Sequence, residues 1–308
     1  MEKRVKEYSR NMELENFLKE INSLLEESEK SLLDMELKEY PVVFVMGAMR
    51  TGSTLMMQWL AETGQFAYPT NMLSRFYGAP IVGAKIQRLL TDQKYNFRNE
   101  ILDFCSETTY ESSNGKTKGA LEPNEFWYFW RRFLPEDVYL YSKEDLHDKV
   151  DFSTMRKELY GIANVYARPL ALKGMICNYN IEFLNEIFPR CLFVCLQRDE
   201  EKHINSVLEA RRRQYGTDKE WYSFKIPEYS RIIEISDVKE QVREQIKCIN
   251  NAIIKGISQL PNEKKLVVQY EEFCQNPQLI YRQIQEKLGE QGYLIDKIYK
   301  GETSFEVR

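Results

Sequence analysis

Histidine is scarce in this chain of 308 residues, which has only two, His147 and His203. So few histidines argue against a histidine-rich metal site and against a Ser-His-Asp triad. The six cysteines are scattered, and no pair has the C-x2-C spacing of a zinc or redox site. We therefore expect no metal centre, and we interpret Cys191 and Cys195, which flank Leu-Phe-Val, as small buried hydrophobic residues.

Long apolar runs and an excess of positive charge are also missing. No run approaches the roughly 18 to 20 apolar residues that a membrane span needs. The charged N-terminus, Met1-Glu-Lys-Arg-Val-Lys-Glu7, lacks the apolar core of a signal peptide. The net charge of −4, from 43 Lys and Arg against 47 Asp and Glu, argues against a general nucleic-acid binder. We therefore expect a cytoplasmic protein without a membrane span and without a nucleic-acid partner.

A further absence lies in a glycine-bracketed loop. The apolar run 42–46 leads into Gly47-x4-Gly52-Ser53-Thr54, which matches a phosphate-binding P-loop except at one position. Ser53 stands where a nucleoside triphosphatase carries the lysine that reaches the β- and γ-phosphates. The loss of that lysine disfavours γ-phosphoryl transfer. Backbone N–H groups and a helix N-terminus can still hold a phosphate there.

Strands and helices alternate along the rest of the chain. We expect strands at 42–46, 170–173, 191–196 and 265–269. We expect helices from Ser53 or Thr54, and over 150–168, 180–188, 201–213, 237–259 and 277–288. This alternation predicts a three-layer α/β fold with a central, mostly parallel sheet, like that of P-loop NTPases. The irregular stretch 64–125, which includes the polar loop 111–119, is expected to build a substrate pocket and lid.

An amphipathic segment precedes this domain. Apolar residues recur there at three- and four-residue steps, which predicts one helix stripe: Leu14, Phe17, Leu18, Ile21, Leu24 and Leu25. The stripe fits a helix docked on the main domain, and it also fits a dimer contact or a partner-binding arm. We therefore divide the chain into an N-terminal helical segment, 1–39, and a domain that spans 40–308.

Three short segments form the most specific pattern in the chain. Arg50-Thr-Gly-Ser-Thr54 follows one apolar strand. Arg198-Asp199 ends another, and Ser206 comes eight residues after Arg198. Tyr270-Glu-Glu-Phe273 is followed by Asn276-Pro277. In this order and at these distances, the segments resemble those of the sulfotransferases that use 3′-phosphoadenosine 5′-phosphosulfate (PAPS).

The resemblance implies transfer of a sulfonate from PAPS to an acceptor oxygen or nitrogen, with the 3′,5′-bisphosphate PAP as product. Residues matched to the 5′-phosphosulfate loop are Arg50, Thr51, Gly52, Ser53 and Thr54. Arg198 and Ser206 match the 3′-phosphate site. Arg50 and Lys173 would stabilise the leaving bisphosphate, so no metal is needed. Lys173 comes from a weaker match to the family's K-x-P segment, because no proline follows it here.

An acceptor hydroxyl also needs a general base, and here the chain departs from the family pattern. Some members place a glutamate after a proline beyond the P-loop helix, where this chain has Pro69-Thr70-Asn71. We favour Glu122 as the base, with Glu125 second, because a residue before Pro123 is expected in extended chain at a pocket edge. We interpret the aromatic run 126–130 either as core or as rings that stack on an acceptor.

Two alternative functions stay open. A P-loop nucleotide kinase needs a lysine and a magnesium-binding aspartate where this chain has Ser53 and Arg198. A non-catalytic nucleotide-binding module is compatible with the missing glutamate after the P-loop. The partners that we expect are a small-molecule or carbohydrate acceptor and, through the N-terminal helix, a second copy in a homodimer.

Overall fold

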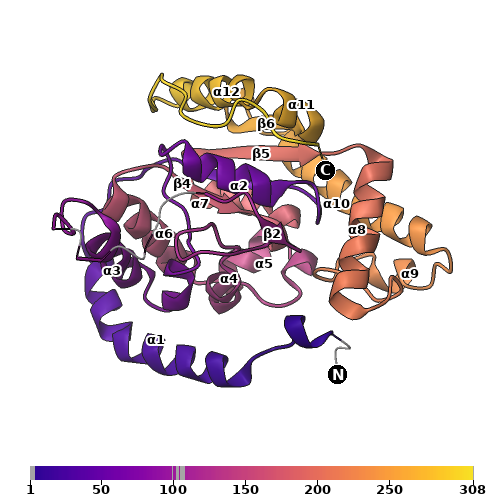
Figure 1. Ribbon diagram of the computed structural model, residues 1–308, viewed down its shortest axis with the longest axis horizontal. Helices are drawn as coiled ribbons and strands as arrows, with labels where there is room; N and C mark the ends of the chain where they lie inside the picture. The colour runs from indigo at the N-terminus through magenta and orange to yellow at the C-terminus, as the bar shows by residue number, and fades with distance from the viewer. Residues whose placement is uncertain (1–3, 99, 102–103, 105–107, 308) are drawn as a thin grey trace.

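A four-stranded parallel sheet in the order β4-β1-β5-β6 lies at the centre of the protein (Figure 1). The computed structural model describes residues 4–98, 100–101, 104 and 108–307. The strands are β1 (Val42–Met46), β4 (Leu170–Lys173), β5 (Cys191–Gln197) and β6 (Lys265–Gln269). All four pair in parallel, so the expected sheet is confirmed.

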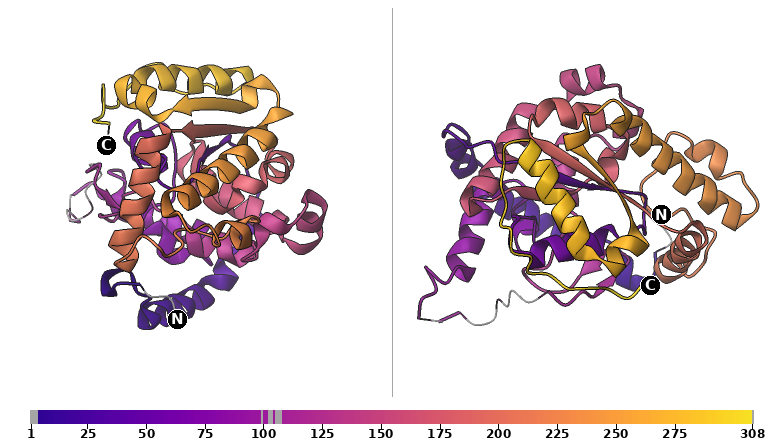
Figure 2. Two further views of the ribbon diagram at one scale, coloured as in Figure 1. Left: turned by 90° about the vertical axis from the view of Figure 1, so that its right-hand side faces the viewer. Right: turned by 90° about the horizontal axis from the view of Figure 1, so that it is seen from above.

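Helices cover both faces of this sheet (Figure 2). The longer ones are α1 (Met12–Leu33), α2 (Ser53–Glu62), α3 (Pro80–Thr91), α6 (Phe152–Tyr166), α8 (Glu200–Tyr215), α10 (Val238–Ser258) and α12 (Pro277–Glu290). Shorter ones are α4 (Trp127–Phe133), α5 (Lys143–Lys149), α7 (Ile181–Ile187), α9 (Tyr229–Ile232) and α11 (Tyr270–Gln275). Single 3-10 turns are η1 (Lys6–Tyr8), η2 (Leu73–Phe76), η3 (Val138–Leu140), η4 (Met175–Tyr179) and η5 (Asn262–Lys264). A small antiparallel hairpin joins β2 (Ser112–Ser113) to β3 (Lys116–Thr117).

The side chains of β1 alternate between two hydrophobic clusters, one on each face of the sheet. Val42, Phe44 and Met46 belong to a cluster built with α6, α7 and α10. Val43 and Val45 belong to a second cluster, built with α2, α11 and α12. Because successive side chains of a strand point to opposite faces, one apolar strand serves both clusters. Together the two clusters and the sheet make three layers.

Local caps determine where several helices begin. The Asp199 carboxylate accepts from the backbone N–H of Lys202 at 3.0 Å and so starts α8 directly after β5. Asn276 caps α12 in the same way, and Pro277 occupies the first helical position, where its fixed φ and missing N–H cost nothing. The Asn-Pro pair seen in the sequence is therefore a helix start.

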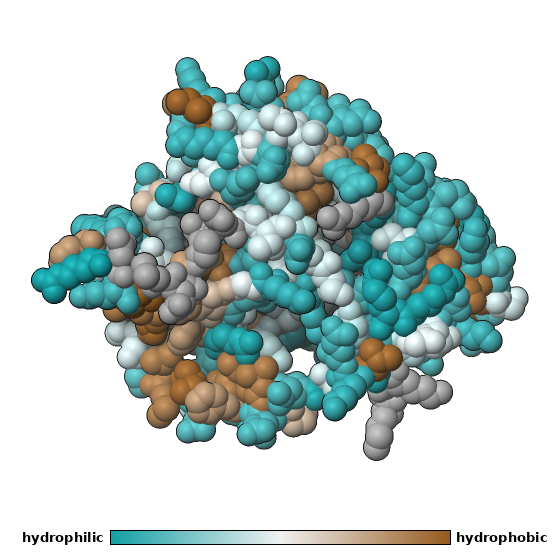
Figure 3. All heavy atoms as spheres, viewed as in Figure 1, coloured by the Kyte–Doolittle hydropathy of each residue, from teal (hydrophilic) through white to brown (hydrophobic). Residues whose placement is uncertain are grey.

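The N-terminal helix α1 docks on α3 and α6, but not through the whole expected stripe. Leu18 is buried, as are Asn22 and Glu29. The Glu29 carboxylate accepts the backbone N–H groups of Ile81 and Val82 at 2.8 and 2.9 Å and so caps α3. Two apolar residues of the stripe are therefore exposed to solvent, Phe17 at 58 % and Leu24 at 73 %. Apolar side chains gather along the part of the surface formed by α1 (Figure 3).

None of the helices in the described part of the chain is both long enough and apolar enough to cross a membrane.

Candidate functional site

The P-loop connects the carboxyl end of β1 to α2 and is held in shape by its neighbours. The Asn178 side chain bonds both backbone groups of Gly47, donating to its oxygen at 2.8 Å and accepting from its nitrogen at 3.3 Å. Gly52 has φ +94°, and a Cβ there would lie 2.3 Å from the Tyr270 ring. Only glycine therefore fits at this position. Gly52 also has no side chain to cap α2, so the first N–H groups of that helix stay available to a ligand.

Arg50 brings two of the sequence segments together at the start of α2. Its Nε donates to Ser206 Oγ at 3.3 Å, and its backbone oxygen accepts from Arg198 Nη1 at 2.9 Å. Arg198 in turn lies over the Tyr270 ring, 4.8 Å from its centroid, which adds the third segment. Arg50 has φ +67°, a strained conformation for a residue with a side chain and one that is concentrated at functional sites.

The charge of Arg50 points to an anionic ligand. Burial lowers the pKa of its guanidinium, and the nearby Arg213 and Arg198 act in the same direction. Within the described residues, Arg50 forms no ion pair, and Ser206 is its side-chain partner. Arg50 is only partly buried, but a partly desolvated cation without an ion-pair partner still gains from a ligand that supplies negative charge. Together with the uncapped start of α2, Arg50 makes this end of the cavity a candidate anion site.

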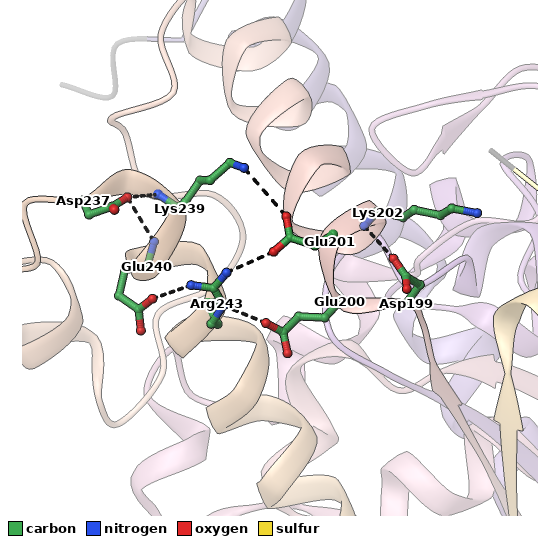
Figure 4. A network of polar contacts seen from close by, with 8 residues as sticks. All are labelled: Asp199, Glu200, Glu201, Lys202, Asp237, Lys239, Glu240 and Arg243. Carbon is green, nitrogen blue, oxygen red and sulfur yellow. Dashed lines mark hydrogen bonds and ion pairs between the residues drawn. The ribbon is translucent and has the colours of Figure 1, made fainter.

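The helix that carries Ser206 is anchored at its first turn (Figure 4). Arg243 of α10 bonds Glu200 and Glu201 at 2.7 and 3.1 Å, and Lys239 lies 3.7 Å from Glu201. Single exposed ion pairs contribute little to stability, but a shared arginine makes this a network that joins α8 to α10. The network therefore orients the start of α8, with Ser206 one and a half turns further along.

His203 supports the loop from the same helix. Its Nε2 lies 2.7 Å from the Met49 carbonyl oxygen, and its ring is buried. Burial lowers its pKa to about 4, so the ring is neutral near pH 7 and carries its proton on Nε2. The structure therefore places His203 beneath the P-loop and not among the residues that line the cavity.

Lys173 and Glu125 meet beside the P-loop. Lys173 ends β4, next to β1, and its Nζ donates to Thr54 Oγ1 at 3.0 Å. The same ammonium forms an ion pair with Glu125 Oε1, while Glu125 Oε2 accepts from Trp127 Nε1 at 2.8 Å. These side chains line a cavity of about 2330 Å³, which also contains Arg50, Gly52, Ser53, Arg198 and Ser206.

Two residues expected at the site lie outside this cavity. Thr51 is fully buried, and its hydroxyl donates to the Ala48 oxygen at 2.9 Å. Glu122 is 5 % exposed, and its carboxylate accepts from Gln58 Nε2 at 2.8 Å and from the Thr109 N–H at 2.9 Å. These contacts hold chain segments together, so the geometry favours Glu125, our second candidate, on the cavity side.

The aromatic run beside Glu125 is divided between core and cavity. Phe126, Phe129 and Trp130 are buried in the core, whereas Trp127 and Tyr128 line the cavity. The core interpretation is therefore confirmed for the buried rings, and stacking of the cavity-lining rings on an acceptor stays a prediction. The far wall of the cavity is formed by the N-terminal segment, and this face is visibly hollowed between α1 and the body of the protein (Figure 3).

Several contributors were not anticipated from the sequence. Asn178, which bonds Gly47, sits in the short 3-10 turn η4 and has no recognisable sequence signal. Tyr8 and Asn11 line the cavity although they precede the domain that we defined. The hairpin tip Asn114-Gly115 also lines the cavity. An Asn-Gly dipeptide is a known hairpin signal, so this turn could have been predicted from the sequence.

The fold is an α/β fold whose glycine-bracketed loop, at the carboxyl edge of the sheet, carries Ser53 where a triphosphatase has its lysine. A family model described as "Sulfotransferase family" matches residues 41–293. The chain therefore belongs to the sulfotransferase family. No curated protein matches it in a sequence comparison.

Two solved structures with the same fold are mycobacterial sulfotransferases. Sulfotransferase STF9 from Mycobacterium avium is 16 % identical, with a TM-score of 0.56 over 87 % of this chain and 68 % of that one. Sulfotransferase STF1 from Mycobacterium tuberculosis H37Rv is 13 % identical, with a TM-score of 0.53 over 87 % of this chain and 72 % of that one. At these identities the likeness establishes a shared fold.

Proposed function

We propose that this protein transfers a sulfonate from PAPS to an acceptor hydroxyl or amine. The observation that carries the proposal is the partly buried Arg50 at the start of α2, which contacts Ser206 and Arg198 and has no ion-pair partner among the described residues. PAPS has anionic groups at two positions, which suits a site with two sources of positive charge. Its 5′-phosphosulfate would bind the loop from Gly47 to Thr54, and its 3′-phosphate would bind Arg198 and Ser206.

The donor supplies a sulfonate on a phosphate leaving group, and the protein supplies the positive charge around it. Arg50 and Lys173 would hold the negative charge that develops on the bridging oxygen as the sulfur–oxygen bond breaks. Thr54 Oγ1 keeps the Lys173 ammonium beside the P-loop.

Glu125 is the general base that we propose. Each of its carboxylate oxygens accepts one hydrogen bond, from Lys173 or Trp127, and each keeps a lone pair for an acceptor hydroxyl. The acceptor oxygen would bond to sulfur as the bond from sulfur to the phosphate oxygen breaks. The acceptor proton would pass to Glu125 and then to water, which balances the reaction as PAP, sulfated acceptor and one proton.

The acceptor is proposed to be a small molecule or a carbohydrate. Trp127 and Tyr128 present aromatic surface to the cavity, which suits the apolar face of a sugar ring or an aromatic alcohol. The cavity exceeds by more than twofold the roughly 1,000 Å³ of a large ligand pocket, so donor and acceptor fit together. Cytoplasmic location and a homodimer through α1 stay predictions from the sequence.

Calorimetry with PAP and with ATP–Mg tests the donor. We expect PAP to bind in the micromolar range or tighter and ATP–Mg to bind at least tenfold more weakly. Equal binding of both would favour a nucleotide kinase, and no binding of PAP would refute the proposal. Turnover of labelled PAPS with a panel of sugars, alcohols and amines then separates an enzyme from a non-catalytic nucleotide-binding module.

A further inference from the structure

The β2–β3 hairpin places its tip directly against the Lys173–Glu125 pair. Its turn residues Asn114 and Gly115 have φ +49° and +86°, as in the tight turns that match strand twist. A Cβ on Gly115 would lie 2.9 Å from Glu125 Oε1 and 3.6 Å from Lys173 Nζ. The backbone therefore approaches the reaction centre as closely as only glycine allows.

Little space remains beneath the hairpin tip. A separate small pocket of about 10 Å³ is lined by Gly115, Thr54, Lys173 and Glu125 together with their neighbours. A single water molecule needs a cavity of roughly 10 to 15 Å³ by this measure. Between the hairpin tip and the Lys173–Glu125 pair there is therefore room for one water at most, while the pair also faces the large cavity.

The N-terminal segment holds this hairpin from outside. Tyr8 Oη and Ser113 Oγ share a hydrogen bond of 2.7 Å, and Lys116 Nζ lies 5.4 Å from the centroid of the Tyr8 ring. Tyr8 is 7 % exposed although it lies in a short turn before α1. The segment is tied to α8 as well, because the Val5 N–H donates to the Gln214 oxygen at 2.9 Å.

A second set of contacts joins the hairpin tip to the donor side. Asn114 Nδ2 donates to the Ala210 oxygen at 3.2 Å, and Asn114 Oδ1 accepts from Arg213 Nε at 3.0 Å. Both partners lie on α8, the helix that carries Ser206. The hairpin therefore contacts α8 at one end, approaches the Lys173–Glu125 pair, and contacts the N-terminal segment.

We infer that the hairpin 112–117 and the N-terminal residues 4–8 together form one cover over the reaction centre, by which we mean the Lys173–Glu125 pair. The hydrogen bond from Tyr8 to Ser113 acts as the latch that holds this cover closed. Tyr8 is a positioning residue, because it acts on Lys173 and Glu125 through the hairpin. The inference rests on the proposed sulfonate transfer. A closed cover keeps water from the donor, so that sulfonate passes to the acceptor and not to water. The side reaction that the cover would prevent is hydrolysis, in which PAPS and water give PAP, sulfate and a proton.

The test is hydrolysis of PAPS without an acceptor, measured for Tyr8→Phe, Ser113→Ala and the double variant. Losing one hydrogen bond raises the open population, so we expect hydrolysis to rise roughly two- to tenfold in each single variant. The double variant should rise no further, because both changes remove the same bond. Tyr95→Phe, the same change on an exposed tyrosine outside the cavity, should hydrolyse PAPS at the wild-type rate.

Two further measurements separate this inference from the donor assignment. PAP affinity should change less than twofold in Tyr8→Phe, because the P-loop and Arg198 are untouched. Amide hydrogen exchange over 112–117 should become faster in Tyr8→Phe, with or without PAP. Unchanged hydrolysis and unchanged exchange in the presence of normal PAP binding would overturn the latch. If wild-type protein binds no PAP, the proposed function fails, while the exchange result still decides whether Tyr8 holds the hairpin.

Discussion

The buried histidine under the P-loop allows a quantitative test of how the candidate anion site is supported. His203 is 1 % exposed and contacts the Met49 carbonyl oxygen. Burial lowers its pKa from the usual 6.5 to about 4, and the nearby positive charges of Arg198 and Arg50 act in the same direction. Its hydrogen bond to Met49 opposes this shift without cancelling it.

The sign of the pH dependence follows from proton uptake in the two states. As the pH falls below 6.5, His203 takes up a proton in the unfolded chain but stays neutral in the folded protein until about pH 4. The unfolded state therefore binds more protons in this window, and the free energy of unfolding falls on acidification. Relative to pH 8, the loss due to His203 is about 2 kcal/mol at pH 5 and about 3 kcal/mol at pH 4.

Urea unfolding of wild-type protein and His203→Gln at pH 8, 7, 6 and 5 measures the pH-dependent contribution of His203 to the free energy of unfolding. The glutamine amide still offers an N–H to the Met49 oxygen but does not titrate, so the variant is insensitive to this proton. We expect the wild type to lose about 2 kcal/mol more than the variant between pH 8 and pH 5. His147 is present in both proteins and cancels. A difference between the two proteins that is constant with pH would refute the neutral, buried state of His203.

Three further predictions concern the loop and the base. Arg50→Lys should weaken PAP binding roughly 10- to 100-fold in calorimetry, because a charged hydrogen-bonding fork is lost, while the melting temperature stays within a few degrees. Gly52→Ala should cost about 2 kcal/mol or more in urea unfolding and abolish PAP binding. The matched control Gly64→Ala, also at positive φ but facing open space, should cost only the backbone strain of about 1 kcal/mol and leave binding intact. Glu125→Gln should lower kcat by about 100-fold or more with unchanged PAP affinity. Glu122→Gln should lower stability and keep turnover. Equal turnover of both glutamine variants would contradict our choice of base.

Most of the fold was open to prediction because its signals are local. The strands 42–46, 170–173 and 265–269 are short apolar runs, and they form where the pattern indicates. The N-terminal helix was only partly predictable. Its apolar stripe indicated a docked face, but Asn22 and Glu29 satisfy backbone groups of the main domain and turn the helix, so Phe17 is left exposed.

The geometry of the candidate site was predictable where the proposed ligand-binding groups belong to the backbone or lie next to a strand end. Gly52 and Arg198 are such residues, since parallel strands bring their carboxyl ends to one edge of the sheet. The choice between Glu122 and Glu125 was not predictable, because three residues along an irregular segment separate a buried structural carboxylate from one that faces the cavity.

The sequence by itself determined the chain's class. Its signals are local patterns: a glycine-bracketed loop without its lysine, a strand-end arginine and a serine eight residues later. Such patterns can be recognised without knowledge of the tertiary structure. Tertiary structure alone decided which groups surround the reaction centre. Tyr8 and Ser113 are 105 residues apart, and their contact depends on where α1 and the hairpin dock, which no short-range periodicity encodes.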